Sequence, residues 1–217
     1  MPKTLSADDI QQFREAMRRV AENAFATRGA QGVTMRELAK ELGCSAMTPY
    51  RYFRDKEEIL AMVRAAAFNR FAARLEAAAR SIPADAPAID HSAVSQAYVA
   101  FALDEPHAYR LMFDQTPQQQ GAYPELAAAS QRAWHLLEAH FERLVEAGVL
   151  EGDPRLIGYA YWTSLHGFTM LALANQLPPS AAQQGDCAAD GARQPSREAV
   201  FAQILRMLWR GALAPRA

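Results

Sequence analysis

The chain has 217 residues and a mass of 24.0 kDa, enough for a buried core without disulfide staples. Val, Ile and Thr together contribute only 21 residues, which excludes a β-rich fold and predicts an all-α protein. Hydrophobic residues make up 50% of the chain and charged residues 22%, so wholesale disorder is also excluded.

Charge is unevenly distributed along the chain, although the formal net charge is only −1. Residues 1–80 contain 14 Lys and Arg against 10 Asp and Glu, whereas residues 81–217 contain 9 against 14. A basic N-terminal part on an acidic remainder favours an anion-binding module attached to a second module that avoids anions.

Cysteine usage and hydropathy predict a protein of the reducing cytoplasm. Cys44 and Cys187 lie far apart without neighbouring ligands at metal spacing, so we expect no disulfide framework, no metal and no cofactor. Asp8 and Asp9 interrupt the apolar run that a secretory signal needs. Residues 158–177 carry no formal charge but include several polar side chains, which favours a buried helix over a membrane span.

The N-terminal third contains the starts and stops of four helices. The first is expected to end before Gly29. A capping box of Thr34 and Glu37 starts the second, short helix. Ser45 can cap a third short helix, and Asp55 caps a fourth that extends to about residue 80.

The remainder is expected to contain five more helices, which brings the total to about nine. A stretch with Pro83 and Pro87 forms a soft boundary before them. Residues 178–195 lack an apolar period and are expected to form a mobile loop. The helices are predicted at residues 91–103, 105–114, 123–147, 154–176 and 196–213.

The second and third helices have the spacing of a helix-turn-helix. Ala39 is small where two helices would approach closely, and Gly43 lies four positions later in the turn. Leu38, Leu42 and Phe53 are expected to form the small core of this motif. An ordinary helical hairpin has the same pattern, so the spacing alone leaves that alternative open.

Residues 33–60 closely resemble the DNA-binding signature of TetR-family transcriptional regulators. The shared features are the T-x-R-E-L-A start, the L-G-x-S turn, the T-x-Y-x-Y-F run and the D-K-E-E-I-L opening of the fourth helix. The resemblance implies that residues 1–54 form a DNA-binding domain and residues 55–217 an effector-binding and dimerisation domain, with residues 55–80 as the linking helix.

A recognition helix must present short side chains, because only then can its backbone approach base edges in the major groove. Ser45, Ala46, Met47 and Thr48 meet this requirement. The resemblance gives base-facing roles to these four residues and to Arg36, the candidate for a bidentate contact with guanine.

A second set of polar side chains suits contacts with phosphate groups, which position a protein on DNA without reading its sequence. This set consists of Thr34, Tyr50, Tyr52 and Lys56. A solvated side chain is the alternative for Lys56, and core packing is the alternative for Tyr50. Pro49 stands where the family commonly has leucine, and it forfeits one hydrogen bond in the first turn of the third helix.

Two stretches of the acidic remainder, residues 102–113 and 162–167, look like a TetR subgroup whose C-terminal domain carries a Trp-His-Gly signature. Aromatic and thioether side chains in the whole acidic remainder are numerous enough to line a cavity for a small molecule. The candidates for ligand binding are Tyr98, Phe101, Tyr109, Met112, Phe113, Trp134, Trp162, His166 and Met170. Core packing is the alternative for these residues, including His166.

Small residues on the eighth helix and a broad apolar face on the last helix predict a four-helix dimer interface around a two-fold axis. The candidate interface residues are Gly158, Ser164, Gly167, Phe201, Ile204, Leu205, Leu208 and Trp209. A homodimer would present two recognition helices to adjacent turns of a palindromic DNA site.

These features predict a ligand-responsive transcriptional regulator, specifically a homodimeric repressor that leaves a palindromic double-stranded operator when an apolar or aromatic effector binds. The alternative is a helical small-molecule sensor or protein-interaction module without operator-specific DNA binding. An enzyme is not expected, because the five histidines form no Glu-x-x-His or His-x-x-x-His pair. The chain also lacks a Gly-rich phosphate loop and a nucleophile elbow.

Overall fold

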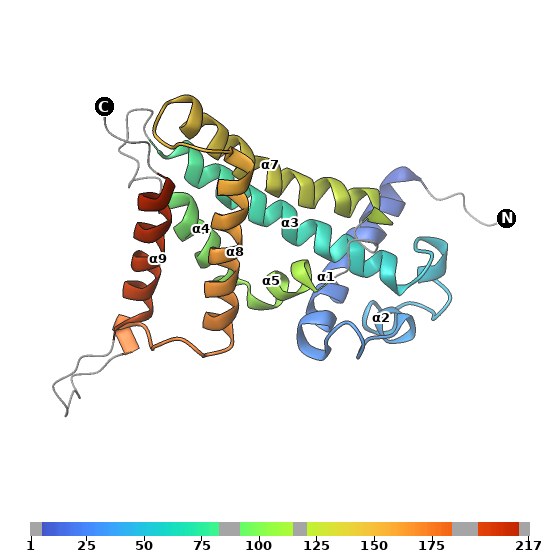
Figure 1. The fold of residues 1–217 in the computed structure, drawn as a ribbon. Helices are drawn as coiled ribbons and strands as arrows, with labels where there is room; N and C mark the ends of the chain where they lie inside the picture. Colours follow the sequence, from blue (N-terminus) through green and yellow to red (C-terminus); the bar gives the residue numbers. More distant parts are fainter. Residues whose placement is uncertain (1–5, 83–91, 115–120, 184–194, 213–217) are drawn as a thin grey trace. The chain divides into compact units, whose positions relative to one another are not determined.

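A computed structural model describes residues 6–82, 92–114, 121–183 and 195–212. These residues form eight α-helices and two short 3₁₀ helices, which confirms the predicted all-α fold (Figure 1). The α-helices are α1 (Ala7–Arg28), α2 (Met35–Glu41), α3 (Lys56–Arg80), α4 (Ser92–Asp104), α5 (Pro106–Phe113), α7 (Pro124–Glu146), α8 (Pro154–Leu173) and α9 (Arg197–Ala212). The 3₁₀ helices are η1 (Pro49–Arg51) and η3 (Ala181–Gln183).

The chain divides into two compact units. The first unit contains Met1–Arg70 and His107–Gln131, and the second contains Phe71–Pro106 and Arg132–Ala217. Helices α3 and α7 therefore contribute residues to both units. The first unit extends beyond the predicted DNA-binding domain, since it also includes α5 from His107 onwards and the first turns of α7.

The first unit is built around an apolar core shared by α1, α2 and α3. Met17 and Phe25 of α1 are buried there together with Leu38 of α2 and Ile59 of α3. Helix α1 ends where Gly29 adopts a φ of 71°, a left-handed conformation that glycine reaches without steric cost. The predicted end of the first helix is therefore confirmed.

A buried arginine attaches α5 to α3 within the first unit. The Nε of Arg64 donates a hydrogen bond to the carbonyl oxygen of Leu111 at 2.9 Å, and its Nη2 donates to the carbonyl oxygen of Asp114. Carbonyl groups at the end of a helix lack intrahelical donors, so the guanidinium satisfies them. Burial lowers the pKa of Arg64 from its ordinary value.

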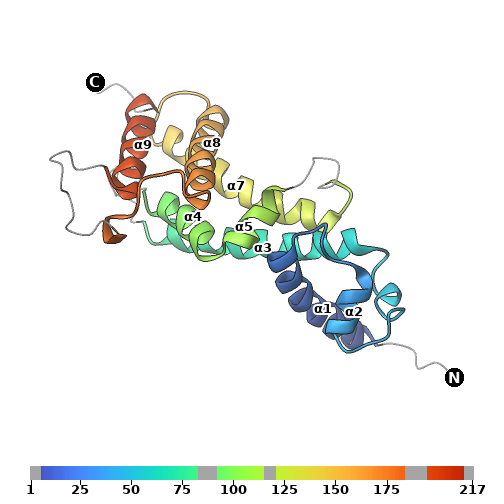
Figure 2. The same ribbon diagram turned by 90° about the horizontal axis from the view of Figure 1, so that it is seen from below.

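The second unit is organised around α8, which packs against α4 and α9. Helices α8 and α9 lie side by side in both Figure 1 and Figure 2. The hydroxyl groups of Ser95 on α4 and Tyr161 on α8 share a buried hydrogen bond. Burial raises the pKa of Tyr161 to about 12, so this hydroxyl stays protonated at neutral pH.

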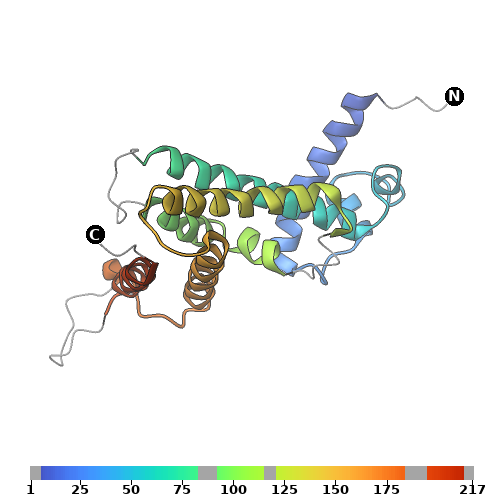
Figure 3. The same cartoon turned by 45° about the horizontal axis from the view of Figure 1, so that its top comes forward.

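The last turns of α3 also belong to this unit, where they run beside α7 (Figure 3). Arg132 of α7 pairs with Glu76 of α3 at 2.7 Å. The ring of Phe71 packs edge-on against Tyr98 and Phe101 of α4, with centroid distances of 5.0 and 5.2 Å. An aromatic cluster thus joins α3 to α4, and an ion pair joins α3 to α7.

Eight of the nine predicted helices are present as α-helices, with boundaries shifted by a few residues. Helix α8 ends at Leu173 instead of residue 176, because Asn175 adopts a φ of 54° that ends the helix. The prediction of a mobile loop over residues 178–195 falls largely on residues 184–194, which lie outside the described residues, as do Pro83 and Pro87. None of the helices in the described part combines the length and apolarity needed to cross a bilayer.

Candidate nucleic-acid interface and ligand cavity

Helix α2 buries one face in the first unit and presents the other face to solvent. Thr34 Oγ1 accepts a hydrogen bond from the backbone N–H of Glu37 at 3.3 Å, and the Glu37 carboxylate accepts one from the backbone N–H of Thr34 at 2.8 Å. The predicted capping box is therefore confirmed. The Thr34 hydroxyl and amide lower the pKa of Glu37 by stabilising its charged form. Leu38 and Ala39 are fully buried, whereas Arg36 is exposed.

The predicted third α-helix is wrong, because the chain forms a series of tighter turns there. The backbone N–H of Thr48 donates to Ser45 O at 2.9 Å, that of Arg51 to Thr48 O at 3.1 Å, and that of Tyr52 to Pro49 O at 2.9 Å. Each of these bonds spans three residues, as in a 3₁₀ helix, whereas the backbone N–H of Phe53 donates to Pro49 O at 2.9 Å across four residues. Pro49 has no N–H, so it cannot form the bond to Ser45 O that an α-helix requires.

We call residues 45–53 the recognition segment. Its first part is open to solvent: Ser45 and Ala46 are exposed, Met47 is 70% exposed and Tyr50 is 51% exposed. Thr48 is half-buried, and its hydroxyl lies 2.8 Å from that of Ser45, so the two share a hydrogen bond. A protruding turn with short side chains can bring its backbone close to base edges.

Two of the predicted phosphate contacts pack against the first unit. The ring of Tyr52 stacks on Phe13 with centroids 4.0 Å apart and an interplanar angle of 16°. The Lys56 Nζ donates a hydrogen bond to the carbonyl oxygen of Ala30 at 2.8 Å. Both side chains therefore have partners within the protein, and their contacts with phosphate stay predictions.

Arg14 of α1 holds the end of the recognition segment, a role that the sequence analysis did not find. Its Nη1 donates to the carbonyl oxygen of Tyr52 at 2.9 Å and to the carboxylate of Glu58 at 3.1 Å. Its guanidinium also lies 4.5 Å from the centre of the Phe53 ring. Glu58 in turn accepts from the backbone N–H of Arg54 at 2.8 Å. One arginine thus joins α1, the recognition segment and α3.

Two further basic residues at this surface were also missed. Arg51 of η1 is exposed beside Tyr50. Arg54 lies over the ring of Tyr123 at 5.5 Å and pairs with Asp55 at 3.2 Å. Interactions with Tyr123 and Asp55 raise the pKa of Arg54, which remains a cation. The sequence signal for these two residues was their positive charge, with Arg51 inside the T-x-Y-x-Y-F run and Arg54 directly after it.

The predicted ligand-binding residues are divided between the two units. Tyr109, Met112 and Phe113 belong to the first unit, whereas the other six belong to the second unit. The rings of Trp162 and His166 lie 5.9 Å apart on α8. Burial lowers the pKa of His166, which favours its neutral form. Their role in binding a ligand stays a prediction.

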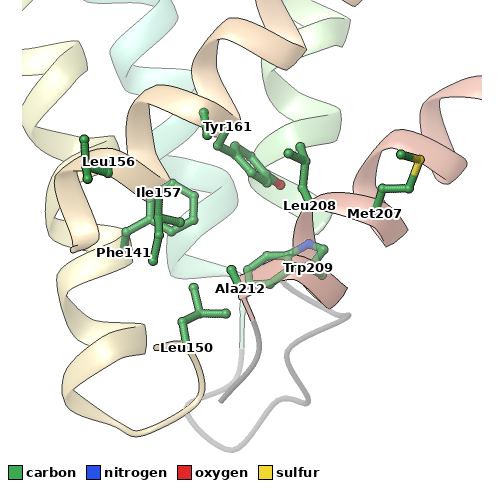
Figure 4. A pocket seen from close by; sticks show the side chains of 11 residues that line it. Phe141, Leu150, Leu156, Ile157, Tyr161, Met207, Leu208, Trp209 and Ala212 are labelled. Carbon is green, nitrogen blue, oxygen red and sulfur yellow. The ribbon is translucent and has the colours of Figure 1, made fainter. Parts of the chain in front are cut away.

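A cavity of about 370 Å³ lies in the second unit between α7, α8 and α9 (Figure 4). None of the nine predicted ligand-binding residues lines it, although two residues predicted for the dimer interface do, Leu208 and Trp209. We call it the α8–α9 cavity. Its lining residues are Phe141, Leu150, Leu156, Ile157, Ala160, Tyr161, Met207, Leu208, Trp209, Gly211 and Ala212.

The predicted dimer-interface residues differ in their exposure. Gly158 is buried, and a Cβ atom there would lie 3.6 Å from the ring of Phe141. Leu205 and Trp209 are buried within the second unit, whereas Gly167 is exposed. The remaining four are half-buried: Ser164, Phe201, Ile204 and Leu208.

The described residues contain no group of His, Cys, Asp and Glu side chains that could hold a metal ion. The fold and the recognition segment define a class of protein in which a basic N-terminal helix-turn-helix precedes further helices. Residues 18–63 match the model of bacterial regulatory proteins of the tetR family, and residues 91–208 match that of the tetracyclin repressor-like C-terminal domain.

This chain belongs to the TetR family of transcriptional regulators, which are DNA-binding proteins and not enzymes. The HTH-type transcriptional regulator Rv1816 of Mycobacterium tuberculosis is 27% identical over 128 residues, which cover 59% of this chain. The match spans only 53% of that regulator, about half of its length. The Trp-His-Gly subgroup stays a prediction.

Solved structures share this fold over nearly the whole chain. A protein of unknown function from Rhodococcus sp. RHA1 is 28% identical with a TM-score of 0.73, covering 99% of this chain and 100% of that one. A TetR-family regulator from Pectobacterium atrosepticum is 20% identical with a TM-score of 0.66, covering 98% of this chain and 100% of that one. The second likeness concerns the fold alone.

Proposed function

We propose that this protein is a homodimeric repressor that binds a palindromic operator in the cytoplasm and leaves it when a small-molecule effector binds. The observation that carries the proposal is the exposed recognition segment beside α2 in a helix-turn-helix. Arg36 reads a guanine, while Ser45, Ala46, Met47 and Thr48 contact neighbouring base edges. Tyr50 and the cationic side chains around it contact phosphates.

Selection from a random duplex pool tests the DNA-binding part of this proposal. The purified protein is expected to enrich a palindrome with half-sites one helical turn apart. Binding to that site should weaken steeply when the salt concentration rises from about 50 to 200 mM, because phosphate contacts release counterions. Enrichment of no sequence would instead support the alternative, a helical sensor without operator-specific binding.

Two variants separate base reading from positioning. Arg36→Ala is expected to relax selectivity at one position of each half-site, with a loss of about 1–3 kcal/mol for the preferred base. Arg51→Ala should weaken binding to all duplexes alike and reduce the salt dependence. Equal behaviour of the two variants would contradict this division of roles.

A stripe of exposed residues along α8 supports dimerisation. We call Leu156, Tyr159, Gly167, Met170 and Leu171 the α8 stripe, since their spacing places them on one face of the helix. The large members are 40–68% exposed. An apolar surface of this kind on a single chain favours a covering partner, and the proposal assigns a second copy of this chain to it.

Gly167→Arg tests the dimer with little effect on the fold expected, because Gly167 is exposed and a Cβ atom added there would meet no other atom within 4 Å. Native mass spectrometry of the wild-type protein is expected to show a dimer, and Gly167→Arg a monomer. Ala139→Arg, at an exposed position of α7, is the control and should remain dimeric. A monomeric wild-type protein would contradict the proposal.

The proposed effector response needs a connection between ligand and DNA contacts. Helix α7 offers one, since it carries Phe141 in the wall of the α8–α9 cavity and begins one residue after Tyr123, whose ring lies under Arg54. A ligand that prefers one position of α7 would shift operator affinity by its ratio of affinities for the two states, about 5- to 150-fold for typical couplings.

A further inference from the structure

The α8–α9 cavity has an aromatic wall of three rings. Phe141 and Tyr161 lie edge-to-face at 5.1 Å, and Tyr161 and Trp209 lie edge-to-face at 6.0 Å. The ring centroids of Phe141 and Trp209 lie 6.5 Å apart, and the ring planes are tilted by 43°. The three rings are almost completely buried against one another, so they form an aromatic base to the cavity, against which a further aromatic ring can pack edge-on or offset.

The rest of the lining is aliphatic, and none of the eleven lining residues carries a charge. A charged ligand would therefore lose its hydration without gaining a counter-ion. The one hydroxyl in the wall belongs to Tyr161, and it is already bonded to Ser95. The chemistry of the wall thus favours an uncharged ligand.

Hydrogen bonds hold the walls of the cavity in place. The backbone N–H of Glu151 donates to the carbonyl oxygen of Ala212 at 2.9 Å, which ties the segment after α7 to the end of α9. The Ser95 hydroxyl fixes Tyr161 from α4. A volume of about 370 Å³ is within the range of small-molecule sites. Leu156 and Met207, which are 68% and 64% exposed, flank an opening to solvent.

We propose that the α8–α9 cavity is the binding site for an uncharged, largely apolar effector that contains an aromatic ring. The inference rests on the proposed ligand response and locates it away from the nine residues predicted from the sequence. Leu156 belongs to both the cavity and the α8 stripe, so an occupant would also act on the proposed dimer surface. An effector bound in the α8–α9 cavity would shift the population of dimers towards the arrangement to which it binds more tightly.

A pair of fluorescent probes tests the site directly on the full-length protein. N-phenyl-1-naphthylamine is uncharged, and its 8-sulfonate has the same rings with one negative charge. The uncharged probe is expected to bind with increased emission and at least tenfold more tightly than the sulfonate. Gly211→Leu is designed to fill the cavity from α9, because Gly211 lines the cavity and a Cβ atom added there would meet no other atom within 4 Å. It should weaken binding of the uncharged probe at least tenfold.

Ala199→Leu, at an exposed position of α9 outside the cavity, is the matched control and should bind the probe like the wild-type protein. If Gly211→Leu fails to fold, Ala160→Leu fills the same cavity from α8 and should give the same loss. Equal affinity for the two probes, or unchanged affinity in the filled variant, overturns the proposal. The proposal is also overturned if the wild-type protein binds no probe and Gly211→Leu weakens the dimer. That result would show that the second subunit fills the cavity.

Probe binding is measured without DNA, so it separates this inference from the proposed function. Specific DNA binding without probe binding would refute the cavity site alone. Probe binding by a protein that selects no duplex would leave the cavity intact and refute the proposed repressor. When both hold, saturating probe should lower the affinity for the selected operator at least fivefold in the wild-type protein and leave it unchanged in Gly211→Leu.

Discussion

Replacing Arg14 by methionine tests whether this half-buried side chain holds the recognition segment. Methionine keeps much of the apolar stem but removes the donors to Tyr52 O and to the Glu58 carboxylate. It also removes the cation above the Phe53 ring. Arg19→Met is the matched control, since Arg19 is an exposed residue of the same helix.

The expected loss follows from these contacts. A hydrogen bond to a charged group contributes about 1.5–3 kcal/mol, and a cation above an aromatic ring about 0.5–1 kcal/mol. The side chains of Arg14 and Glu58 are 24% and 26% exposed, so solvent screens part of the stabilisation from these contacts. We therefore expect Arg14→Met to reduce the free energy of unfolding by about 2 kcal/mol.

Urea denaturation followed by circular dichroism measures the effect. With a slope of about 2 kcal/mol per M, the midpoint of Arg14→Met should fall by about 1 M. Arg19→Met should stay within about 0.5 kcal/mol of the wild-type protein. A midpoint for Arg14→Met that matches the control would refute the idea that this arginine fixes the segment.

Three further predictions concern single side chains. Thr34→Ala removes the cap of α2 and should cost about 1 kcal/mol in urea denaturation, and an unchanged midpoint would contradict the capping geometry. Tyr161→Phe leaves the buried Ser95 hydroxyl without its tyrosine partner and should cost about 1–2 kcal/mol, which the double variant with Ser95→Ala should partly recover. The pKa of His166 is lower in the folded protein than in the unfolded chain. As the pH falls below about 6.5, the unfolded chain therefore takes up a proton before the folded protein does. The free energy of unfolding should therefore fall from about pH 6.5 downwards. His166→Gln should show a smaller fall, and equal falls in the two proteins would contradict this assignment.

Local sequence signals were sufficient for most of the fold. Apolar periodicity and caps such as Thr34 with Glu37 predicted eight α-helices, because these signals act within a few residues of each other. The prediction of a third α-helix is wrong because the effect of Pro49 extends beyond the loss of one hydrogen bond in a first turn. Its missing N–H removes the α-type bond to Ser45 O, and three of the backbone bonds in the recognition segment span three residues instead of four.

Contacts between distant residues account for what the sequence could not predict. Arg14 reaches Glu58 across 44 positions, and nothing in the local pattern of α1 distinguishes it from Arg19. The α8–α9 cavity likewise forms from three helices, with Phe141 and Trp209 far apart in the sequence. An aromatic stripe on one helix predicts burial, but it does not tell which rings surround empty volume.

Targeted DNA cleavage tests most directly whether the recognition segment enters the major groove. Met47→Cys, in a protein whose Cys44 and Cys187 are replaced by serine, is coupled to an iron chelate that cleaves nearby deoxyribose. On the selected operator we expect two clusters of cuts, one in each half-site, with a pattern offset across the major groove. Absent cutting while the protein still protects the operator would contradict the central claim.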